Sequence, residues 1–393
     1  MKHSFYNVGH AETIFIEPDD NTLIVRDFGK NQKKIIPYYK NYHNAYNHLT
    51  QRLNDGHTTI DAVISHAHAD HISGFKELHK NFNASNVKIF KNSFVPKQDY
   101  SSPDTLDSIL LRLSIYGILY CSANSRMYNR SKNWINFMPI IKDLSHNVIE
   151  VCQGYKINHW SKPATVLWPE KNFHFDFWQE SRDYETLKKA VHALNTMQSH
   201  VLLESITNLE GIVINQHNES AANSFSNLEI VENSLSIVNS TFRNGNNTKY
   251  SPLIFSPRVV RAYRHCVDND SLVFAFDDDS ALYLSDLDGD ALNAMMHVNP
   301  MKNKYSLLKT AHHGTRICAR LQNCNFDKII HCCGETLSTY DGPTIDYNHC
   351  NSGNVICLDW DNNASTQKWD PNVKQNSTIH DPIANPIIVF NTP

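Results

Sequence analysis

The 393-residue sequence predicts an α/β protein in which potential metal ligands follow short strands. Three apolar runs have the composition of buried strands, and each is followed by histidine or aspartate: Thr59–Ile64, Ala281–Leu284 and Ser306–Thr310. Pro37 to Asn54 instead has the apolar spacing of an amphipathic helix. Because sites in α/β folds form at the carboxyl ends of strands, we expect the polar residues after these runs to lie together.

The composition excludes some classes of protein and favours others. Hydrophobic residues make up 41% of the chain, so a substantial core can be buried in one large domain or two ordinary ones. The net charge of −4 excludes a global basic field, so any polyanion would be held by a local patch and by metal. The nine cysteines form no CxxC pair, which favours buried thiols in a reducing compartment.

The sequence lacks the character of a membrane or secretion segment. The first residues have no apolar signal core, and no run approaches the roughly 18 apolar residues of a membrane span. We therefore expect a cytoplasmic protein with no membrane partner.

The most informative stretch is Ser65–Phe75, which follows the first of the three strands. His66, His68, Asp70 and His71 place four potential ligands within six residues, in the pattern His-x-His-x-Asp-His. In an extended loop His66 and His68 point the same way, and the two later ligands then turn toward a second position. Imidazole and carboxylate ligands at two adjoining positions suit two cations side by side.

This stretch resembles the metal-binding loop of the metallo-β-lactamase fold. Further stretches resemble one subgroup of that superfamily, the β-lactamase-like domain of bacterial competence DNA-uptake proteins and their soluble relatives: Asn7–Glu12, Arg26–Gly29, Ala164–Pro169, Ser271–Asp290 and Ser306–Thr315. The resemblance implies an αββα sandwich. In the first of these stretches His10 and Glu12 depart from the subgroup's pattern, and both a place near the metals and a structural role in a tight turn are open.

The resemblance covers both ends of the chain and divides it into three parts. Residues 1–171 and 251–393 are expected to form the two halves of the metallo-β-lactamase fold, and residues 172–250 an insertion of helix and Asn/Ser-rich loop. Glu180 to Leu209 has the periodicity of one long helix or two. Asn215 to Asn247 is expected to be a loop, with an added strand at Ser234–Val238. The insertion would overhang the site or form a packing surface, and it is a candidate surface for a protein partner.

The same resemblance extends the set of candidate metal ligands. Asp286 is the first aspartate after its strand and is expected to bridge two metals, with Asp288 and Asp290 as rivals. One residue of the pair His312 and His313 is expected to complete the second metal position, and His312, nearer the strand, is favoured. The other histidine would contact substrate or hydrogen-bond to a ligand, and both are retained as candidates.

The first metal position lacks one ligand in this scheme. Most members of the superfamily add a third histidine, for which the candidates in the insertion are His192, His200 and His217. The competence-protein subgroup often has a polar residue there instead, and the candidates for it are Asp268, Asn269 and Asp270. The open site with such a polar residue is favoured over any single histidine.

These residues predict a metal-dependent hydrolase with two divalent ions, zinc first and manganese or iron as alternatives. A hydroxide bridging the metals would attack phosphorus or a carbonyl, and Asp70 would hold the second metal and orient the water or take its proton. The resemblance favours a phosphodiesterase or nuclease that acts on nucleic acid or a nucleotide. The alternatives are an acyl hydrolase of lactones, lactams or thioesters, and a non-catalytic sensor or interaction protein on the same scaffold.

Basic residues that could meet a phosphodiester occur in two places. Arg258, Arg261 and Arg264 recur at intervals of three, as on one face of a helix. A second group lies around the histidine pair: Lys302, Lys304, Lys309, Arg316 and Arg320. For the three arginines, a solvated helix face and a phosphate clamp are both open.

Overall fold

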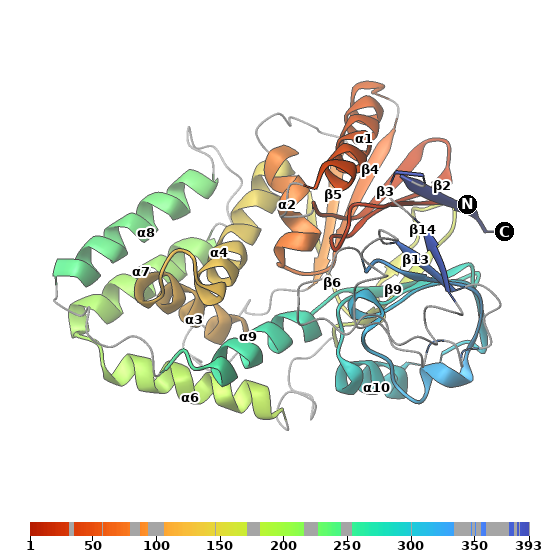
Figure 1. Cartoon of the computed structure of the whole chain (residues 1–393). Coiled ribbons are helices and arrows are strands. Elements are labelled where there is room, and N and C mark those ends of the chain that lie inside the picture. Colours follow the sequence, from red (N-terminus) through yellow and green to blue (C-terminus); the bar gives the residue numbers. More distant parts are fainter. Residues whose placement is uncertain are drawn as a thin grey trace.

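The fold consists of two mixed β-sheets, helices on their outer faces and a block of helices to one side (Figure 1). The computed structural model describes residues 1–30, 35–56, 58–78, 87–92, 106–145, 147–170, 181–215, 227–244, 254–299, 301–333, 347, 350, 355–358, 377–380, 383–384 and 386–392. The predicted α/β class is confirmed.

The first sheet has the strand order β15-β1-β2-β3-β4-β5-β6. Its strands are β1 (Lys2–Tyr6), β2 (Thr13–Asp19), β3 (Thr22–Phe28), β4 (Thr59–Ile64), β5 (Val87–Asn92), β6 (Val148–Val151) and β15 (Ile387–Asn391). Neighbours from β15 to β3 are antiparallel, and neighbours from β3 to β6 are parallel. The parallel strand β4 therefore delivers the metal loop to one edge of this sheet.

The second sheet has the order β14-β13-β12-β11-β10-β9-β8-β7. Its strands are β7 (Lys156–Ile157), β8 (Ala164–Trp168), β9 (Val273–Phe276), β10 (Ala281–Tyr283), β11 (Lys304–Lys309), β12 (Asn325–His331), β13 (Val355–Leu358) and β14 (Ser377–His380). Strands β10 to β14 are parallel, so the segments after β10 and β11 emerge at the same edge. These segments contain Asp286 and the histidine pair.

The two sheets share one buried core. Phe5 and Val63 of the first sheet belong to the same apolar cluster as Phe274 and Leu307 of the second, and all four are fully buried. Trp160, in the segment between β7 and β8, belongs to the same core. Burial of this much aromatic and aliphatic surface fixes the sheets face to face and so sets the positions of their edges.

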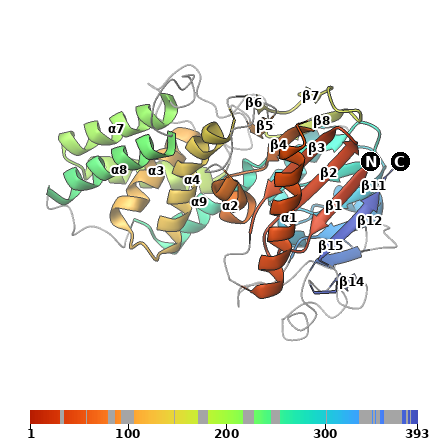
Figure 2. The same ribbon diagram turned by 90° about the horizontal axis from the view of Figure 1, so that it is seen from above.

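Helices cover the outer face of each sheet. α1 (Ile36–Asn54) and α2 (Ala69–Leu78) pack against β3 and β4, and the predicted amphipathic helix is confirmed in α1 (Figure 2). α10 (Gly289–Val298) packs against β10 and β11 of the second sheet. Both packings are apolar, as with Leu49 of α1 and Met295 of α10.

The remaining described helices form a block beside the sheets (Figure 1). They are α3 (Leu106–Tyr120), α4 (Arg126–Leu144), α6 (Arg182–Thr196), α7 (His200–Asn215), α8 (Asn227–Asn244) and α9 (Pro257–Asn269). A hydrogen-bonded ion pair joins α3 to α7, with Arg112 Nε 2.6 Å from Glu210 Oε1. Helix α9 leaves this block and ends beside β9, so it links the block to the sheets.

Part of the predicted insertion differs from expectation. The expected loop from Asn215 to Asn247 and the strand at Ser234–Val238 are wrong, because α8 occupies residues 227–244. Val231, Val238 and Phe242 are buried at helical spacing, so tertiary packing overrides the poor helix propensity of the asparagines and serines. The expected helix from Glu180 to Leu209 is confirmed as two helices, α6 and α7. Residues 216–226 and 245–247 of the expected loop lie outside the described part of the chain.

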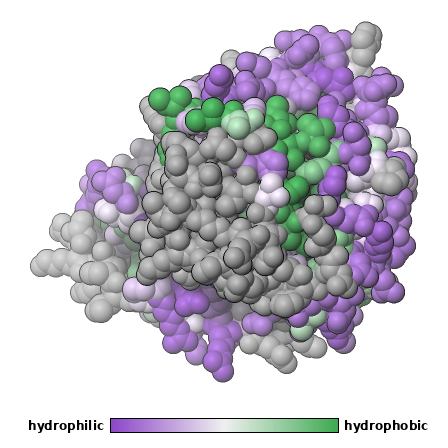
Figure 3. Space-filling model, turned by 45° about the vertical axis from the view of Figure 1, so that its right-hand side comes forward, coloured by the Kyte–Doolittle hydropathy of each residue, from purple (hydrophilic) through white to green (hydrophobic). Residues whose placement is uncertain are grey.

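Among the described residues, no helix has both the length and the apolar character that a membrane span requires. On the face in Figure 3, hydrophobic residues gather near the top and right of centre, and hydrophilic residues lie along the upper and right-hand margins.

The shared core yields a prediction for stability. Phe274 is fully buried and stacks on Tyr283 with ring centroids 5.1 Å apart. Phe274→Ala should lower the free energy of unfolding by about 3–5 kcal/mol, because it removes apolar contacts and leaves a cavity. Chemical denaturation measures this. Val389→Ala, at a side chain 48% exposed, is the control and should change stability by less than about 0.5 kcal/mol. Equal effects of the two substitutions would contradict the shared core.

Candidate metal centre

Three strand ends and the end of α9 converge on one buried cluster of histidines and carboxylates. The metal loop follows β4, Asp286 follows β10, the histidine pair follows β11, and Asp268 lies in the last turn of α9. Backbone hydrogen bonds hold these segments together: His312 N donates to Ser285 O at 2.9 Å, and Leu272 N donates to Ser65 O at 2.9 Å. The parallel strands therefore bring the ligands together, as predicted from the strand-end pattern.

The first group of potential ligands consists of His66, His68 and Asp268. Their donor atoms lie within 4.8 Å of one another, and His68 Nδ1 is 3.0 Å from Asp268 Oδ1. His312 Nδ1 lies 3.8 Å from the other oxygen of Asp268. This group has the imidazole and carboxylate donors that bind zinc and similar cations.

The second group contains His71, Asp286, His313 and Glu12, and Asp70 and His10 adjoin it through His313. His71 Nε2 lies 3.4 Å from Asp286 Oδ2, and His313 Nε2 lies 3.6 Å from the same oxygen. His313 Nε2 is also 3.4 Å from Asp70 Oδ2. The ring of His10 lies over that of His313, with centroids 4.0 Å apart.

Asp286 belongs to both sides of this cluster. Its Oδ2 atom lies 3.9 Å from His66 Nε2 as well as close to the second group. Asp286 also forms a third group with Asp268 and His312. The buried carboxylate of Asp286 therefore adjoins both groups, with imidazole nitrogens of His66, His71 and His313 within 3.9 Å of its Oδ2 atom.

Buried polar atoms in this cluster fit a bound cation. Within the described residues, His68 Nε2, His71 Nε2 and Asp286 Oδ1 are buried without a hydrogen-bond partner. Burying such atoms unpaired costs free energy that a coordinated metal ion would recover. The buried clusters of histidine, aspartate and glutamate can hold a metal ion.

The electrostatics keep the carboxylates ionised. Burial alone would raise the pKa of Asp286, but the neighbouring His71 and His313 outweigh it and hold that pKa well below its usual range. Burial would likewise lower the pKa of His71, but Asp286 and Asp27 outweigh it and raise that pKa well above its usual value. Burial and the adjacent His71 and His68 hold the pKa of His66 well below its usual value, which favours the neutral form that binds metal.

Asp27 fixes the orientation of His71. Asp27 Oδ2 accepts a hydrogen bond from His71 Nδ1 at 2.8 Å, and Asp27 Oδ1 accepts one from Ser65 N at 2.7 Å. Burial would raise the pKa of Asp27, but Arg26 and His71 outweigh it and lower that pKa. With Nδ1 engaged, Nε2 of His71 points to Asp286, which is the arrangement of a metal-binding histidine supported by a carboxylate.

Glu12 and Gly29 hold the start of α2 in place. Glu12 forms a buried ion pair with Lys309, and its backbone N donates to Asp70 O at 2.9 Å. A Cβ atom on Gly29 would lie 1.6 Å from that same carbonyl oxygen, so only glycine permits the approach. The open role of Glu12 thus includes both support of the loop and a place in the second ligand group.

The structure brings all seven predicted candidate ligands into this cluster: His66, His68, Asp70, His71, Asp286, His312 and His313. The sequence favoured His312 as the ligand of the second position. In the structure His313 lies beside Asp70 of the second group, whereas His312 lies beside Asp268 of the first. Both histidines of the pair have positive φ values, 44° and 57°, and their rings stand at 88° to each other. This left-handed turn, which the sequence pattern does not specify, sends the two side chains to different groups.

Asp268 takes the place left open in the first group. The other two polar candidates are engaged elsewhere: the Asn269 side chain donates to Asp288 Oδ2 at 2.7 Å, and Asp270 accepts from Asn92 Nδ2. Asp288 itself caps α10. Of the histidine candidates, His192 and His200 belong to none of the ligand groups found in the described ranges, and His217 lies outside those ranges.

No known protein-family model and no curated protein matches the chain. The resemblance of the metal loop and the strand ends to the metallo-β-lactamase fold therefore stays a prediction.

The position of Asp268 yields a prediction for metal binding. Asp268→Asn keeps the size of the side chain and removes its charge, so zinc affinity should fall by at least about tenfold. Equilibrium dialysis against a competing chelator measures the affinity. His192→Gln, at an exposed position on α6, is the control and should leave the affinity unchanged. A larger effect of His192→Gln than of Asp268→Asn would place the missing ligand on the insertion.

Proposed function

We propose that this protein is a metal-dependent hydrolase of phosphodiesters, built on an αββα metallo-β-lactamase sandwich. The observation that carries this proposal is the pair of adjoining ligand groups that share the buried carboxylate of Asp286. Two sheets packed face to face with helices outside support the fold. Four stretches that resemble the competence-protein subgroup contribute a residue to this cluster or a hydrogen bond to it: Asn7–Glu12, Arg26–Gly29, Ser271–Asp290 and Ser306–Thr315.

Two divalent ions, zinc first and manganese or iron as alternatives, would occupy the two groups. The first ion would be held by His66, His68 and Asp268, and the second by Asp70, His71 and His313, with Asp286 between them. Bound divalent ions supply Lewis acidity and make water a nucleophile near neutral pH.

Asp70 is the residue best placed to handle a proton. Its side chain is 26% exposed, whereas those of His71 and Asp286 are at most 3% exposed. Burial would raise the pKa of Asp70, but His71 and His313 outweigh it and keep the carboxylate ionised. An ionised, partly exposed carboxylate at the edge of the cluster can orient an attacking water and accept its proton. His10, 33% exposed and 3.9 Å from Asp70 Oδ2, lies at the same edge.

The charge beside the first group favours a phosphodiester over a neutral ester. Arg264 Nε lies 3.6 Å from Asp268 Oδ2, and its side chain remains 33% exposed. A guanidinium at this position can bind the anionic oxygens of a phosphodiester, which a lactone, lactam or thioester lacks. This is the observation that separates the two hydrolase alternatives.

Paired reporters test the proposed reaction. The purified protein should hydrolyse bis(p-nitrophenyl) phosphate faster than p-nitrophenyl acetate, should lose this activity with a chelator, and should regain it with zinc or manganese. Turnover of the ester alone would contradict the phosphodiesterase. Absence of bound metal together with no activity after metal addition would identify a non-catalytic protein.

A substitution tests the role of the second group. His71→Ala should lower phosphodiesterase activity by at least about 100-fold, because it removes a ligand and leaves Asp27 and Asp286 without their shared partner. The rate of reporter hydrolysis at saturating metal measures this. His200→Gln, exposed on α7, is the matched control and should keep full activity. Full activity of His71→Ala would overturn the assignment.

A further inference from the structure

Helix α9 connects the metal cluster to a row of arginines. Asp268 lies in its last turn, Arg264 one turn earlier, and Arg261 and Arg258 at further steps of three residues. At about 1.5 Å per residue, Arg258 lies roughly 15 Å along the helix from Asp268. Arg258 and Arg261 are exposed, so this row opens to solvent as it leaves the metal cluster.

A pocket between α4 and α9 gathers four guanidinium groups. Its volume is roughly 500 Å³, and the arginines that line it are Arg126 and Arg130 of α4 and Arg261 and Arg264 of α9. Arg130 Nη1 donates to the carbonyl of Val260 at 3.4 Å, which ties α4 to α9 at this point. Arg264 lines this pocket and also contacts Asp268 of the first ligand group, so the pocket adjoins the metal cluster at this residue.

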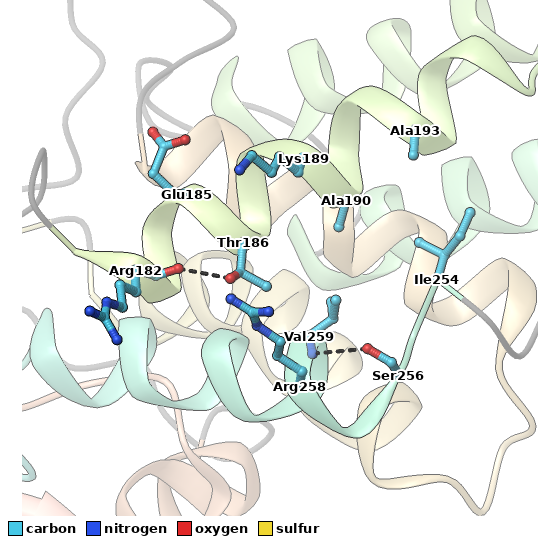
Figure 4. Close-up of a pocket in the computed structure, with 10 residues that line it drawn as sticks. All are labelled: Arg182, Glu185, Thr186, Lys189, Ala190, Ala193, Ile254, Ser256, Arg258 and Val259. Atoms are coloured by element: carbon cyan, nitrogen blue, oxygen red, sulfur yellow. Dashed lines mark hydrogen bonds between the residues drawn. The ribbon is translucent and has the colours of Figure 1, made fainter.

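A second basic groove lies on the other side of α9, against α6. Its volume is roughly 480 Å³, and Arg182, Lys189 and Arg258 lie along it (Figure 4). Glu185, the one carboxylate among the described residues that line it, forms an ion pair with Lys188. The exposed side of α9 between the two cavities carries Arg258 and Arg261, so the basic surface continues from one cavity to the other.

These charges are poorly balanced within the protein. Among the residues that the structure describes, no carboxylate forms an ion pair with Arg126, Arg130 or Arg261. Arg264 contacts one carboxylate, that of Asp268, at 3.6 Å, and the neutral or cationic ring of His265 at 3.2 Å. Burial, with the nearby charge of Arg264, lowers the pKa of Arg130. Guanidinium groups held together against their mutual repulsion favour a bound anion, and the net charge of −4 shows that this surface is a local concentration of positive charge.

We propose that Arg126, Arg130, Arg258, Arg261 and Arg264 form a binding site, the α9 arginine site, for the phosphate backbone of a single nucleic-acid strand. Arginine binds phosphate oxygens through two parallel hydrogen bonds and tolerates any base sequence. The three arginines of α9 span roughly 9 Å along the helix, more than twice the roughly 3.4 Å rise per nucleotide of one DNA strand. A strand on this site would lead toward Asp268 and the metal cluster.

The use of this site in cleavage rests on the proposed hydrolase function, but the binding itself does not. In that reaction the α9 arginine site would hold a strand on one side of the scissile phosphodiester. It would thus select a polynucleotide over a mononucleotide, because a single phosphate cannot reach both the metal cluster and the far arginines.

The binding of an oligonucleotide to the full-length protein, treated with a chelator so that no metal is bound, tests the proposal. The probe is a fluorescein-labelled single-stranded oligodeoxynucleotide, followed by anisotropy over a range of salt concentrations. The double variant Arg126→Gln/Arg261→Gln should bind at least tenfold more weakly than the unsubstituted protein. Its log–log salt slope should be smaller by about 1.4, at about 0.7 per lost phosphate contact of a single strand. Arg126→Lys/Arg261→Lys, which keeps both charges, should retain the salt slope.

The control variant is Lys40→Gln/Arg243→Gln, which removes the same charge from exposed positions that line neither cavity. It should leave both affinity and slope unchanged. Equal affinities of the two Gln double variants would overturn the proposal. Displacement of the oligonucleotide by polyglutamate at equal charge concentration would also overturn it, because the site would then not distinguish phosphate from carboxylate.

The two proposals can fail separately. Weakened oligonucleotide binding in Arg126→Gln/Arg261→Gln, with no reporter hydrolysis by the metal-loaded unsubstituted protein, would support the α9 arginine site and remove the hydrolase. Reporter hydrolysis by the unsubstituted protein, with unchanged oligonucleotide affinity in the double variant, would keep the hydrolase and remove the arginine site.

Discussion

The placement of one buried carboxylate, Asp286, against imidazoles of both ligand groups is the constraint on which the rest of the structure depends. An ionised group at 2% exposure is tolerated only where opposite charge or a cation compensates its lost hydration. Here His66, His71 and His313 each place a ring nitrogen within 3.9 Å of Asp286 Oδ2. The cluster is therefore stable as a set, and each member has its partners on a different element of the fold.

The surrounding fold serves to hold that set in register. Two parallel strand ends from opposite sheets, after β4 and β10, supply the metal loop and Asp286, and the shared apolar core fixes the distance between them. Asp27 orients His71, and the Glu12–Lys309 ion pair with the close approach at Gly29 fixes the start of α2. These supporting contacts are buried, so they keep the ligands oriented without competing for the open edge near Asp70.

The local sequence pattern predicted the metal loop and the strand before it, and the predictions that differ from the structure differ for physical reasons. The spacing from His66 to His71 and the β-branched strand before it are properties of adjacent residues, so the sequence alone indicates them. The choice of Asp268 over Asn269 and Asp270 depends on how α9 meets the metal loop, a contact between distant segments. The exchange of His312 and His313 follows from left-handed backbone conformations, and the helix α8 follows from burial of Val231 and Phe242 against other helices. Tertiary contacts decided the position of Asp268 and the formation of α8, and the local pattern of residues encodes neither these contacts nor the left-handed turn.

Helix α9 joins the chemistry of the cluster to the helical block. It contributes Asp268 at one end and exposed arginines at the other, so one rigid element relates the ligand cluster to a basic surface. The packing of the helical block beside the sheets therefore holds this basic surface next to the ligand cluster.

The most direct measurement of the central claim is anomalous diffraction at the zinc edge from crystals of the zinc-loaded protein. We predict two anomalous peaks, one on each side of the Asp286 carboxylate. Zinc peaks elsewhere, with none next to Asp286, would contradict the account.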